Sequence, residues 1–564
     1  MEALDWLVIG VFFLALIGII VWVVRQKQND SADYFLGGRD ATWLAIGASI
    51  FASNIGSEHL IGLAGAGASS GMAMAHWEIQ GWMILILGWV FVPFYSRSMV
   101  YTMPEFLERR YNPQSRTILS VISLVSYVLT KVAVTVYAGG LVFQQVFGIK
   151  ELWGIDFFWI AAIGLVVLTA LYTIFGGMKS VLYTSVLQTP ILLLGSLIIL
   201  VLGFKELGGW DEMMRVCGAV TVNDYSDTMT NLIRSNDDAN FPWLGALIGS
   251  AIIGFWYWCT DQFIVQRVLS GKNEKEARRG TIFGAYLKLL PVFLFLIPGM
   301  IAFALHQKYI GAGGEGFLPM LANGTANADA AFPTLVAKLL PAGVKGLVVC
   351  GILAALMSSL ASLFNSSAML FTIDFYKRFR PETPEKKLVG IGQIATVVIV
   401  ILGILWIPIM RSVGDVLYTY LQDVQSVLAP GIAAAFLLGI CWKRTSAQGG
   451  MWGLIAGMII GLTRLGAKVY YSNAGEVADS TFKYLFYDMN WLFFCGWMFL
   501  FCIIVVIVVS LATEAPTAEK IQGLVFGTAT KEQKAATRAS WDHWDIIHTV
   551  IILAITGAFY WYFW

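Results

Sequence analysis

Apolar stretches of about 20 residues recur from one end of the chain to the other, and each is long enough to cross a hydrocarbon core of roughly 30 Å as a helix. Of the 564 residues, 58% are hydrophobic and 13% are charged, whereas a soluble domain has about 25% charged residues. A soluble all-helical core could not cover so many apolar faces. The sequence therefore predicts an all-α polytopic membrane protein.

The hydropathy pattern predicts fourteen transmembrane helices. Their approximate ranges are 4–24, 41–68, 73–98, 115–146, 154–175, 180–203, 242–267, 280–306, 343–372, 388–410, 416–441, 448–466, 489–512 and 542–563. The first has no basic region before it and has Arg25 and Lys27 after it. This is the wrong charge order for a cleaved signal peptide, so we interpret it as a retained helix.

The positive charges predict how the chain is oriented. With the N-terminus outside, Lys and Arg gather in the predicted inner loops, for example at Lys272, Lys275, Arg278 and Arg279. The predicted outer loops 204–241, 307–340 and 467–488 are longer and poor in both residues. Cytoplasmic loops carry this excess of positive charge. We therefore expect a multi-pass protein of the plasma or inner membrane with both termini outside.

Two predicted spans contain polar residues at the depth of the membrane centre. Segment 41–68 carries Asn54 and Glu58, and segment 242–267 carries Asp261, each near glycines. Such breaks are tolerated where the backbone lines a cavity, and a pair of them in corresponding positions indicates inverted repeats with a site between them. The alternative is that the glycines only permit close helix packing.

This pattern predicts the organisation of the whole chain. The expected parts are a leading helix and inner loop (1–40), a first five-helix repeat (41–204), an outer loop (205–241), a second five-helix repeat (242–442), and three trailing helices (443–564) that include the inner loop 513–541.

A cation site is predicted where the first broken helix meets the ninth span. Ala355, Ser358 and Ser359 follow an i, i+3, i+4 spacing and share one helix face. A break after Ala52 and Ile55 would free two carbonyl groups. Five neutral oxygens suit a monovalent hard cation better than Ca²⁺ or Mg²⁺, which recruit carboxylates. The alternative is that the serines bond back to their own helix.

A polar pocket with aromatic walls is also predicted inside the membrane. Its polar members are Asn54, His59, Glu78, Lys288 and Gln422, and its aromatic neighbours are Trp77, Tyr257, Trp258 and Tyr418. This lining suits a neutral ligand with many hydroxyl groups and an apolar ring face. A carboxylate substrate would favour arginine, but the arginines gather at loops and helix ends. The alternative is that Glu78 and Lys288 only neutralise each other.

Enzymatic motifs are absent from the sequence. It has no HExxH motif, no Walker A motif and no CxxC spacing among its six cysteines. We therefore expect neither an enzyme nor a nucleic-acid partner.

At these residues the chain resembles the sodium/glucose cotransporter branch of the sodium:solute symporter family, of sugar or inositol type. The segments that carry the resemblance are ASNIGSEHLIGLAGAGASSGMA, WYWCTDQFIVQRVLSGKN, LKLLPVFLFLIPGM, LMSSLASLFNSSAMLFTIDFYKR and FLLGICWKR. The resemblance implies a leucine-transporter-like core of two inverted five-helix repeats, with flanking helices.

The resemblance also implies a role for each site residue. It implies sodium at Ala52, Ile55, Ala355, Ser358 and Ser359. It implies sugar contacts at Asn54, His59, Glu78, Lys288 and Gln422, with Tyr257 as the inner gate and Trp258 beside it. It places Leu63, Trp77 and Tyr418 at the outer gate and Tyr137 in the cavity wall.

Two departures from the family pattern bear on stoichiometry. Ser185, in LYTSVLQT, stands where family members often have aspartate, and Ala361 stands where members with a second sodium site have Thr or Ser. Both remove oxygen ligands.

We therefore expect alternating-access symport of a neutral sugar or polyol, glucose-like, galactose-like or inositol, with Na⁺ as coupling ion and one sodium per sugar. The alternatives are a transporter-like membrane sugar sensor, a leak channel, or a proton-coupled symporter.

Overall fold

The computed structural model describes residues 1–26, 30–56, 58–321, 324–413, 417–473 and 478–564. Within these ranges, the side chains of 129–130, 141, 145, 409–413, 417–423 and 473 are not described. The described chain is mostly helical, and its one sheet is the short antiparallel pair β1 (Glu151–Leu152) and β2 (Ile155–Asp156).

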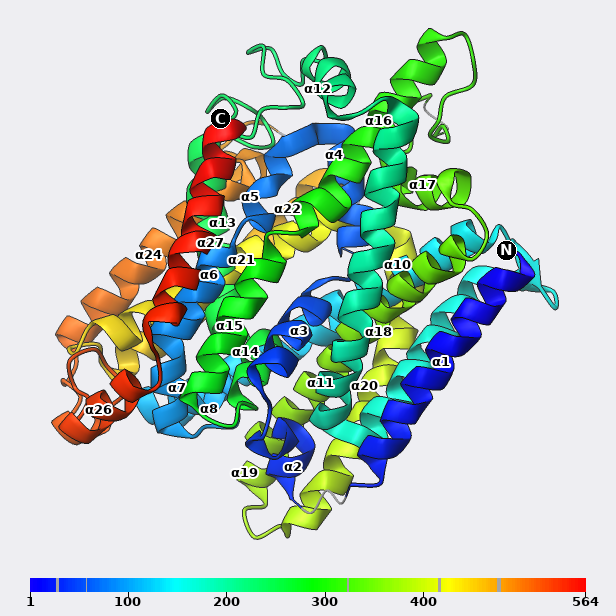
Figure 1. Ribbon diagram of the computed structural model, residues 1–564. Helices are drawn as coiled ribbons and strands as arrows, with labels where there is room; N and C mark the ends of the chain where they lie inside the picture. The colour runs from blue at the N-terminus through cyan, green and yellow to red at the C-terminus, as the bar shows by residue number, and fades with distance from the viewer. Residues whose placement is uncertain (27–29, 57, 322–323, 414–416, 474–477) are drawn as a thin grey trace.

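The described residues up to Leu207 form eleven α-helices, which Figure 1 shows in blue to green. They are α1 (Ala3–Val24), α2 (Ser31–Leu36), α3 (Trp43–Asn54), α4 (Ala64–Ser70), α5 (Ala75–Glu78), α6 (Gly81–Ile86), α7 (Val92–Ser98), α8 (Met103–Arg110), α9 (Pro113–Ser126), α10 (Ala133–Phe147) and α11 (Phe157–Leu207).

The described residues after Leu207 form the remaining α-helices. They are α12 (Trp210–Gly218), α13 (Trp243–Gly254), α14 (Gln262–Leu269), α15 (Glu274–Lys288), α16 (Ile297–Gly311), α17 (Ala331–Leu339), α18 (Val344–Met369), α19 (Lys377–Phe379), α20 (Glu385–Val413), α21 (Leu417–Cys441), α22 (Ala447–Asn473), α23 (Thr481–Lys483), α24 (Trp491–Ala512), α25 (Ala518–Ile521), α26 (Lys531–Ala539) and α27 (His543–Tyr562).

Eleven helical runs within the described residues are long and apolar enough to cross a membrane. They do not correspond one to one with the fourteen predicted spans. The run Phe157–Leu207 holds two predicted spans, joined at Gly177, where a positive φ of 53° marks a kink. The broken span 41–68 yields only the 12-residue α3 before its break, and α3 is too short to count alone.

Both predicted helix interruptions are present. After α3 ends at Asn54, Ile55 is extended (φ −79°, ψ 109°), and the chain resumes as a π-helical turn at Glu58–Leu63. After α13, a π-helical turn at Phe255–Thr260 leads to Asp261, which is also extended (φ −78°, ψ 126°) before α14 begins. A helix that ends inside the protein leaves its last carbonyl groups without intrahelical partners.

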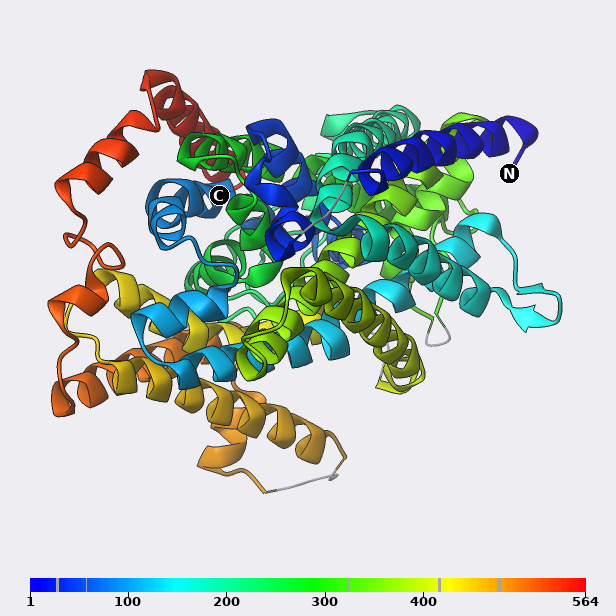
Figure 2. The ribbon, with the colours of Figure 1, turned by 90° about the horizontal axis from the view of Figure 1, so that it is seen from below.

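The interrupted helices lie at the centre of the molecule. The helix α3 packs against α15, α11 and α18, and α1 packs along α11 and α18. Figure 1 shows α12 at one end of the molecule and α2, α19 and α26 at the other, and Figure 2 shows the same bundle from below.

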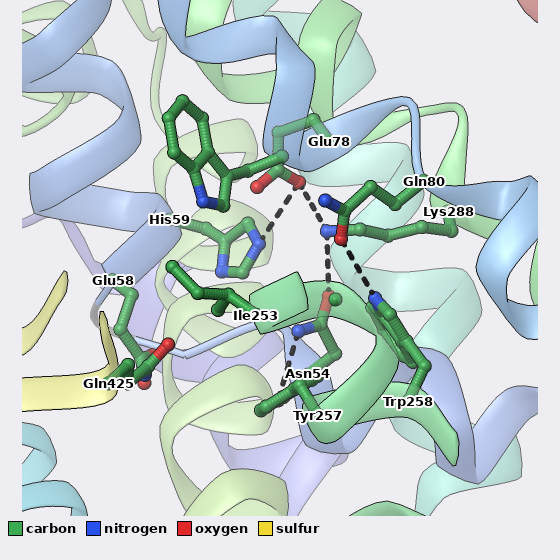
Figure 3. A pocket seen from close by; sticks show the side chains of 12 residues that line it. Asn54, Glu58, His59, Glu78, Gln80, Ile253, Tyr257, Trp258, Lys288 and Gln425 are labelled. Carbon is green, nitrogen blue, oxygen red and sulfur yellow. Dashed lines mark hydrogen bonds and ion pairs between the residues drawn. The ribbon is translucent and has the colours of Figure 1, made fainter. Parts of the chain in front are cut away.

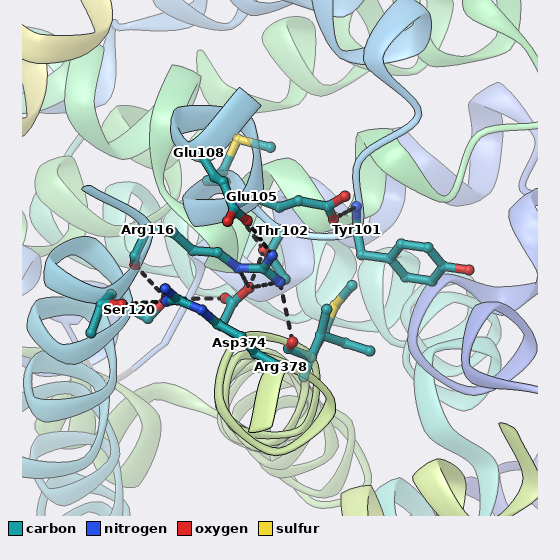
Figure 4. A network of polar contacts seen from close by, with 12 residues as sticks. Tyr101, Thr102, Glu105, Glu108, Arg116, Ser120, Asp374 and Arg378 are labelled. Carbon is teal, nitrogen blue, oxygen red and sulfur yellow. Dashed lines mark hydrogen bonds and ion pairs between the residues drawn. The ribbon is translucent and has the colours of Figure 1, made fainter. Parts of the chain in front are cut away.

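A polar network joins α8, α9 and the π-helical segment Leu370–Tyr376, which continues α18 toward α19 (Figure 4). The Arg116 guanidinium donates to Asp374 Oδ1 at 2.7 Å and to Glu108 Oε2 at 2.5 Å. Thr102 and Ser120 also donate to the Asp374 carboxylate, at 2.8 and 3.1 Å. The side chain of Asp374 is fully buried, so this network holds a charged group that water does not reach.

The C-terminal end of α27 contacts α5, which lies at the start of the third predicted span. His76, in α5, faces Tyr560 Oη across 3.0 Å through Nδ1 and the carbonyl oxygen of Leu232 across 3.1 Å through Nε2. The backbone nitrogen of Leu232 in turn donates to the carbonyl of Phe563 at 2.9 Å. The C-terminal end of the chain and the loop after α12 therefore contact each other, and both contact α5.

Candidate substrate and cation site

A small cavity of about 70 Å³ lies beside the two interruptions (Figure 3). Its walls come from α3, the turn Glu58–Leu63, α5, α13 with the turn that follows it, α15 and α21. The lining residues are Asn54, Glu58, His59, Trp77, Glu78, Gln80, Ile253, Gly254, Tyr257, Trp258, Lys288 and Gln425.

A continuous chain of polar contacts crosses this cavity. Lys288 Nζ donates to Glu78 Oε2 at 2.6 Å and to Asn54 Oδ1 at 3.1 Å. The Asn54 amide then donates to Tyr257 Oη at 3.1 Å. Figure 3 shows these side chains pointing toward one another from α3, α5, α15 and the turn after α13. The chain joins both interrupted helices through groups that can also bond hydroxyl oxygens.

Glu78 is the charged centre of that chain. Its Oε2 lies 2.6 Å from Lys288 Nζ and 3.2 Å from His59 Nε2. Glu78 and Lys288 are each only 3% exposed. A buried charge needs a partner to offset the loss of hydration, and each of these two residues supplies that partner to the other.

Gln80 supports the aromatic wall on the other side. Its Oε1 accepts from Trp258 Nε1 at 3.3 Å, and its Nε2 donates to the carbonyl of Ser250 at 2.8 Å. Lys288 Nζ lies 5.4 Å from the centre of the Trp258 ring. These contacts fix the Trp258 indole beside the lysine, so a flat apolar surface adjoins the charged groups.

Several polar atoms that line the cavity have no hydrogen-bond partner among the described residues. They are Trp77 Nε1, His59 Nδ1 and Glu58 Oε2, all buried. Buried polar groups are normally hydrogen-bonded. Two nitrogen atoms and one carboxylate oxygen are therefore available to a bound molecule or ion.

Of the expected outer-gate residues whose side chains are described, only Trp77 lines this cavity. Trp77 lines the cavity and stacks on Trp491, with ring centres 5.5 Å apart. Leu63 is fully buried, and Tyr137 packs edge-on against Phe158, but neither lines this cavity. Tyr418 and Gln422 belong to α21, and their side chains fall outside the described ones.

The five expected cation ligands are all buried, at the end of α3 and along α18. A Cβ atom built on Gly56 would lie 3.2 Å from Ser359 Oγ, so the break after α3 directly faces α18. Ser358 Oγ lies 3.3 Å from Ser185 Oγ. Among the described residues, neither Ser358 nor Ser359 donates to a carbonyl of its own helix. The alternative that these serines only bond back to their helix is therefore not what the structure shows.

A second buried ion pair lies next to Tyr257. Lys131 Nζ donates to Asp261 Oδ2 at 2.7 Å and lies 4.9 Å from the centre of the Tyr257 ring. Tyr127 Oη also donates to Asp261 Oδ1. Sequence reasoning noted Asp261 only as an interruption. An intramembrane lysine at Lys131 was the available signal that this carboxylate had a partner.

Comparison with known proteins identifies the family. The profile of the sodium:solute symporter family matches residues 34–457. This chain belongs to the sodium:solute symporter family. Sodium/myo-inositol cotransporter 2 of Mus musculus is 37% identical over 542 residues, which cover 94% of this chain and 80% of that protein. Sodium/glucose cotransporter 4 of Danio rerio is 35% identical over 558 residues, covering 96% and 84%.

The fold of this symporter is also found among solved structures. A substrate-bound outward-open Na⁺-coupled sialic acid symporter superimposes with a TM-score of 0.73 at 22% identity, covering 92% of this chain and 99% of that one. The resemblance seen in the sequence is confirmed. The protein is a multi-pass membrane transporter coupled to sodium, not an enzyme.

Proposed function

We propose that this symporter uses the sodium gradient to take up a neutral sugar or polyol, of glucose, galactose or inositol type. The observation that carries the proposal is the polar chain from Tyr257 to Glu78 inside an aromatic-walled cavity. Its charges are paired, so it offers hydrogen bonds to hydroxyl groups without a net charge that would select an ion. Relatives that cover most of the chain are cotransporters of myo-inositol and glucose.

In this proposal each of the expected site residues has one role. Asn54, His59, Glu78, Lys288 and Gln422 bind substrate hydroxyls, with Trp258 beside the ring and Tyr257 as the inner gate. Trp77, Leu63 and Tyr418 form the outer gate, and Tyr137 lines the access route. The free Nδ1 atom of His59 supports its role, because a substrate hydroxyl group can pair with it as donor or as acceptor.

Sodium binds between the two repeats in the same proposal. The carbonyls of Ala52, Ile55 and Ala355 and the hydroxyls of Ser358 and Ser359 supply five oxygen ligands. The approach of Gly56 to Ser359 supports this site, because the broken end of α3 lies against the face of α18 that carries Ser359. The ion joins α3 to α18 and favours one arrangement of the two repeats.

We further propose fourteen spans arranged as two inverted repeats, 41–204 and 242–442, preceded by 1–40, separated by the outer loop 205–241 and followed by 443–564 with its inner loop 513–541. Both termini are outside. The matching interruptions after α3 and α13 support the repeat. In Figure 1 the C-terminus lies at the same end as α12, which belongs to the outer loop.

The proposed cycle is alternating access. A membrane potential of 100 mV supplies about 2.3 kcal/mol for each charge that moves across, and the sodium gradient adds to it. Coupling requires that the ion bind one conformation more tightly than the other, since equal affinity shifts no equilibrium. Sodium bound between α3 and α18 meets this requirement if these two helices move apart in the inward-open conformation.

The test is counterflow in vesicles that contain the purified protein, with labelled glucose, galactose and myo-inositol. We expect exchange of at least one of them in sodium and none in potassium or choline. Exchange that ignores sodium and follows pH would instead indicate proton coupling. Binding without any exchange would indicate a sensor, and sodium current without substrate would indicate a leak channel.

A further inference from the structure

Glu58 is a charged residue of the cavity that the roles above do not use. It is the first residue of the π-helical turn that follows the break in α3. Figure 3 shows its side chain on the cavity wall near Gln425, at the side away from the Glu78–Lys288 pair. Its Oε2 atom is buried and has no hydrogen-bond partner in the described part of the chain.

The same oxygen also lies near Ser359, one of the expected cation ligands. A Cβ atom built on Gly56 would lie 2.5 Å from Glu58 Oε2 and 3.2 Å from Ser359 Oγ. The carboxylate and the serine hydroxyl therefore approach the same glycine. Both groups can come this close to the backbone because Gly56 has no side chain.

The two buried lysines of this region already contact other carboxylates. Lys288 Nζ lies 2.6 Å from Glu78, and Lys131 Nζ lies 2.7 Å from Asp261. A buried carboxylate oxygen without a partner is unfavourable. A monovalent cation at the Ala52, Ile55, Ala355, Ser358 and Ser359 ligands would offset the charge of Glu58.

We propose that Glu58 is an electrostatic ligand of the coupling ion, placed between the ion and the substrate cavity. It adds one full negative charge to a set of otherwise neutral oxygens, and this charge sets the sodium affinity of the empty transporter. The same side chain lines the substrate cavity, so ion binding fixes one wall of the cavity before the sugar enters. This inference rests on the proposed sodium site.

The experiment titrates purified full-length protein with Na⁺ in the absence of sugar, by ²²Na⁺ binding and by the sodium-dependent rise in unfolding temperature. Choline replaces sodium at constant ionic strength. The test variant is Glu58→Gln, which keeps the shape and removes the charge. The matched control is Glu532→Gln, which makes the same change at an exposed position in α26.

We expect Glu58→Gln to raise the half-saturating sodium concentration roughly tenfold or more, because a charge close to a poorly hydrated ion contributes strongly. Glu532→Gln should match the wild type. Glu58→Asp keeps the charge but withdraws it by one methylene, so it should raise the concentration by a smaller factor. If Glu58→Gln does not fold, Glu58→Asp carries the test alone.

Wild-type sodium affinity in Glu58→Gln, or in Glu58→Asp when that variant stands alone, would overturn the inference. So would a loss of sodium affinity seen only when sugar is present, because Glu58 would then act through the substrate. A wild-type protein that binds no sodium would refute the proposed function as well. Sodium binding by the wild type that is unaffected by the charge of Glu58 would refute this inference alone.

Discussion

The ion pair between Glu78 and Lys288 can either bind substrate or only neutralise itself, and a pair of variants separates the two roles. In Glu78→Gln, Lys288 Nζ loses its 2.6 Å contact with a carboxylate and retains its 3.1 Å contact with Asn54. Both residues of the pair are 3% exposed. Removing one partner of a buried pair costs about 3–5 kcal/mol, since the other charge stays buried without compensation.

The double variant Glu78→Gln/Lys288→Met removes that buried charge. Replacing a whole buried pair by neutral groups of similar size is often close to neutral for stability. We therefore expect the single variant to unfold at a clearly lower temperature and the double variant to recover most of the loss. Substrate affinity should not recover, because a hydrogen bond to a charged group contributes about 1.5–3 kcal/mol, or roughly ten- to hundredfold in affinity.

The assay combines thermal unfolding of the purified variants with counterflow in sodium-loaded vesicles. Stability and the half-saturating substrate concentration are measured on the same preparations. A double variant that recovers both stability and wild-type substrate affinity would refute the binding role. The pair would then be structural only.

Three further predictions follow from the same geometry. Ser359→Ala should abolish sodium-driven uptake in a folded protein, and normal sodium dependence of counterflow would remove this residue from the ion site. One sodium should move per sugar, because Ser185 and Ala361 supply too few oxygens for a second ion. Reversal potentials that give about two charges per sugar would contradict this. If the wild type moves about one charge per sugar, the double variant Ser185→Asp/Ala361→Thr should move more. Asp374→Asn should lower the unfolding temperature, because Arg116 loses a buried charged partner 2.7 Å away, and an unchanged temperature would show that the network in Figure 4 adds little.

Much of the fold could be predicted because few backbone conformations are stable in a lipid bilayer. A segment such as 242–267 can contain Asp261 only if the chain breaks beside a cavity or a partner, and the structure shows both the break and the partner. The number of spans was harder to predict, because one helical run such as Phe157–Leu207 can hold two of them. Hydropathy reports the total apolar length but not the kink at Gly177.

The site was predicted in part for a similar reason. Asn54 and Glu78 were recognisable as polar residues at membrane depth, but their partners are set by tertiary packing that spacing does not encode. Gln80 supports Trp258 across 178 residues of sequence, and Gln425 lines the cavity one helical turn from the predicted Gln422. Neither residue type is unusual enough to be singled out without the fold.

The contacts behind α5 also have a consequence for how the protein is made. His76 is bound by Tyr560, which follows it by 484 residues, and the loop at Leu232 is bound by the backbone of Phe563. A ribosome that synthesises the chain from its N-terminus releases α5 long before α27 is available. Contacts this distant in sequence form late, so the wall of the cavity that carries Trp77 and Glu78 lacks this part of its support until the last helix has entered the membrane.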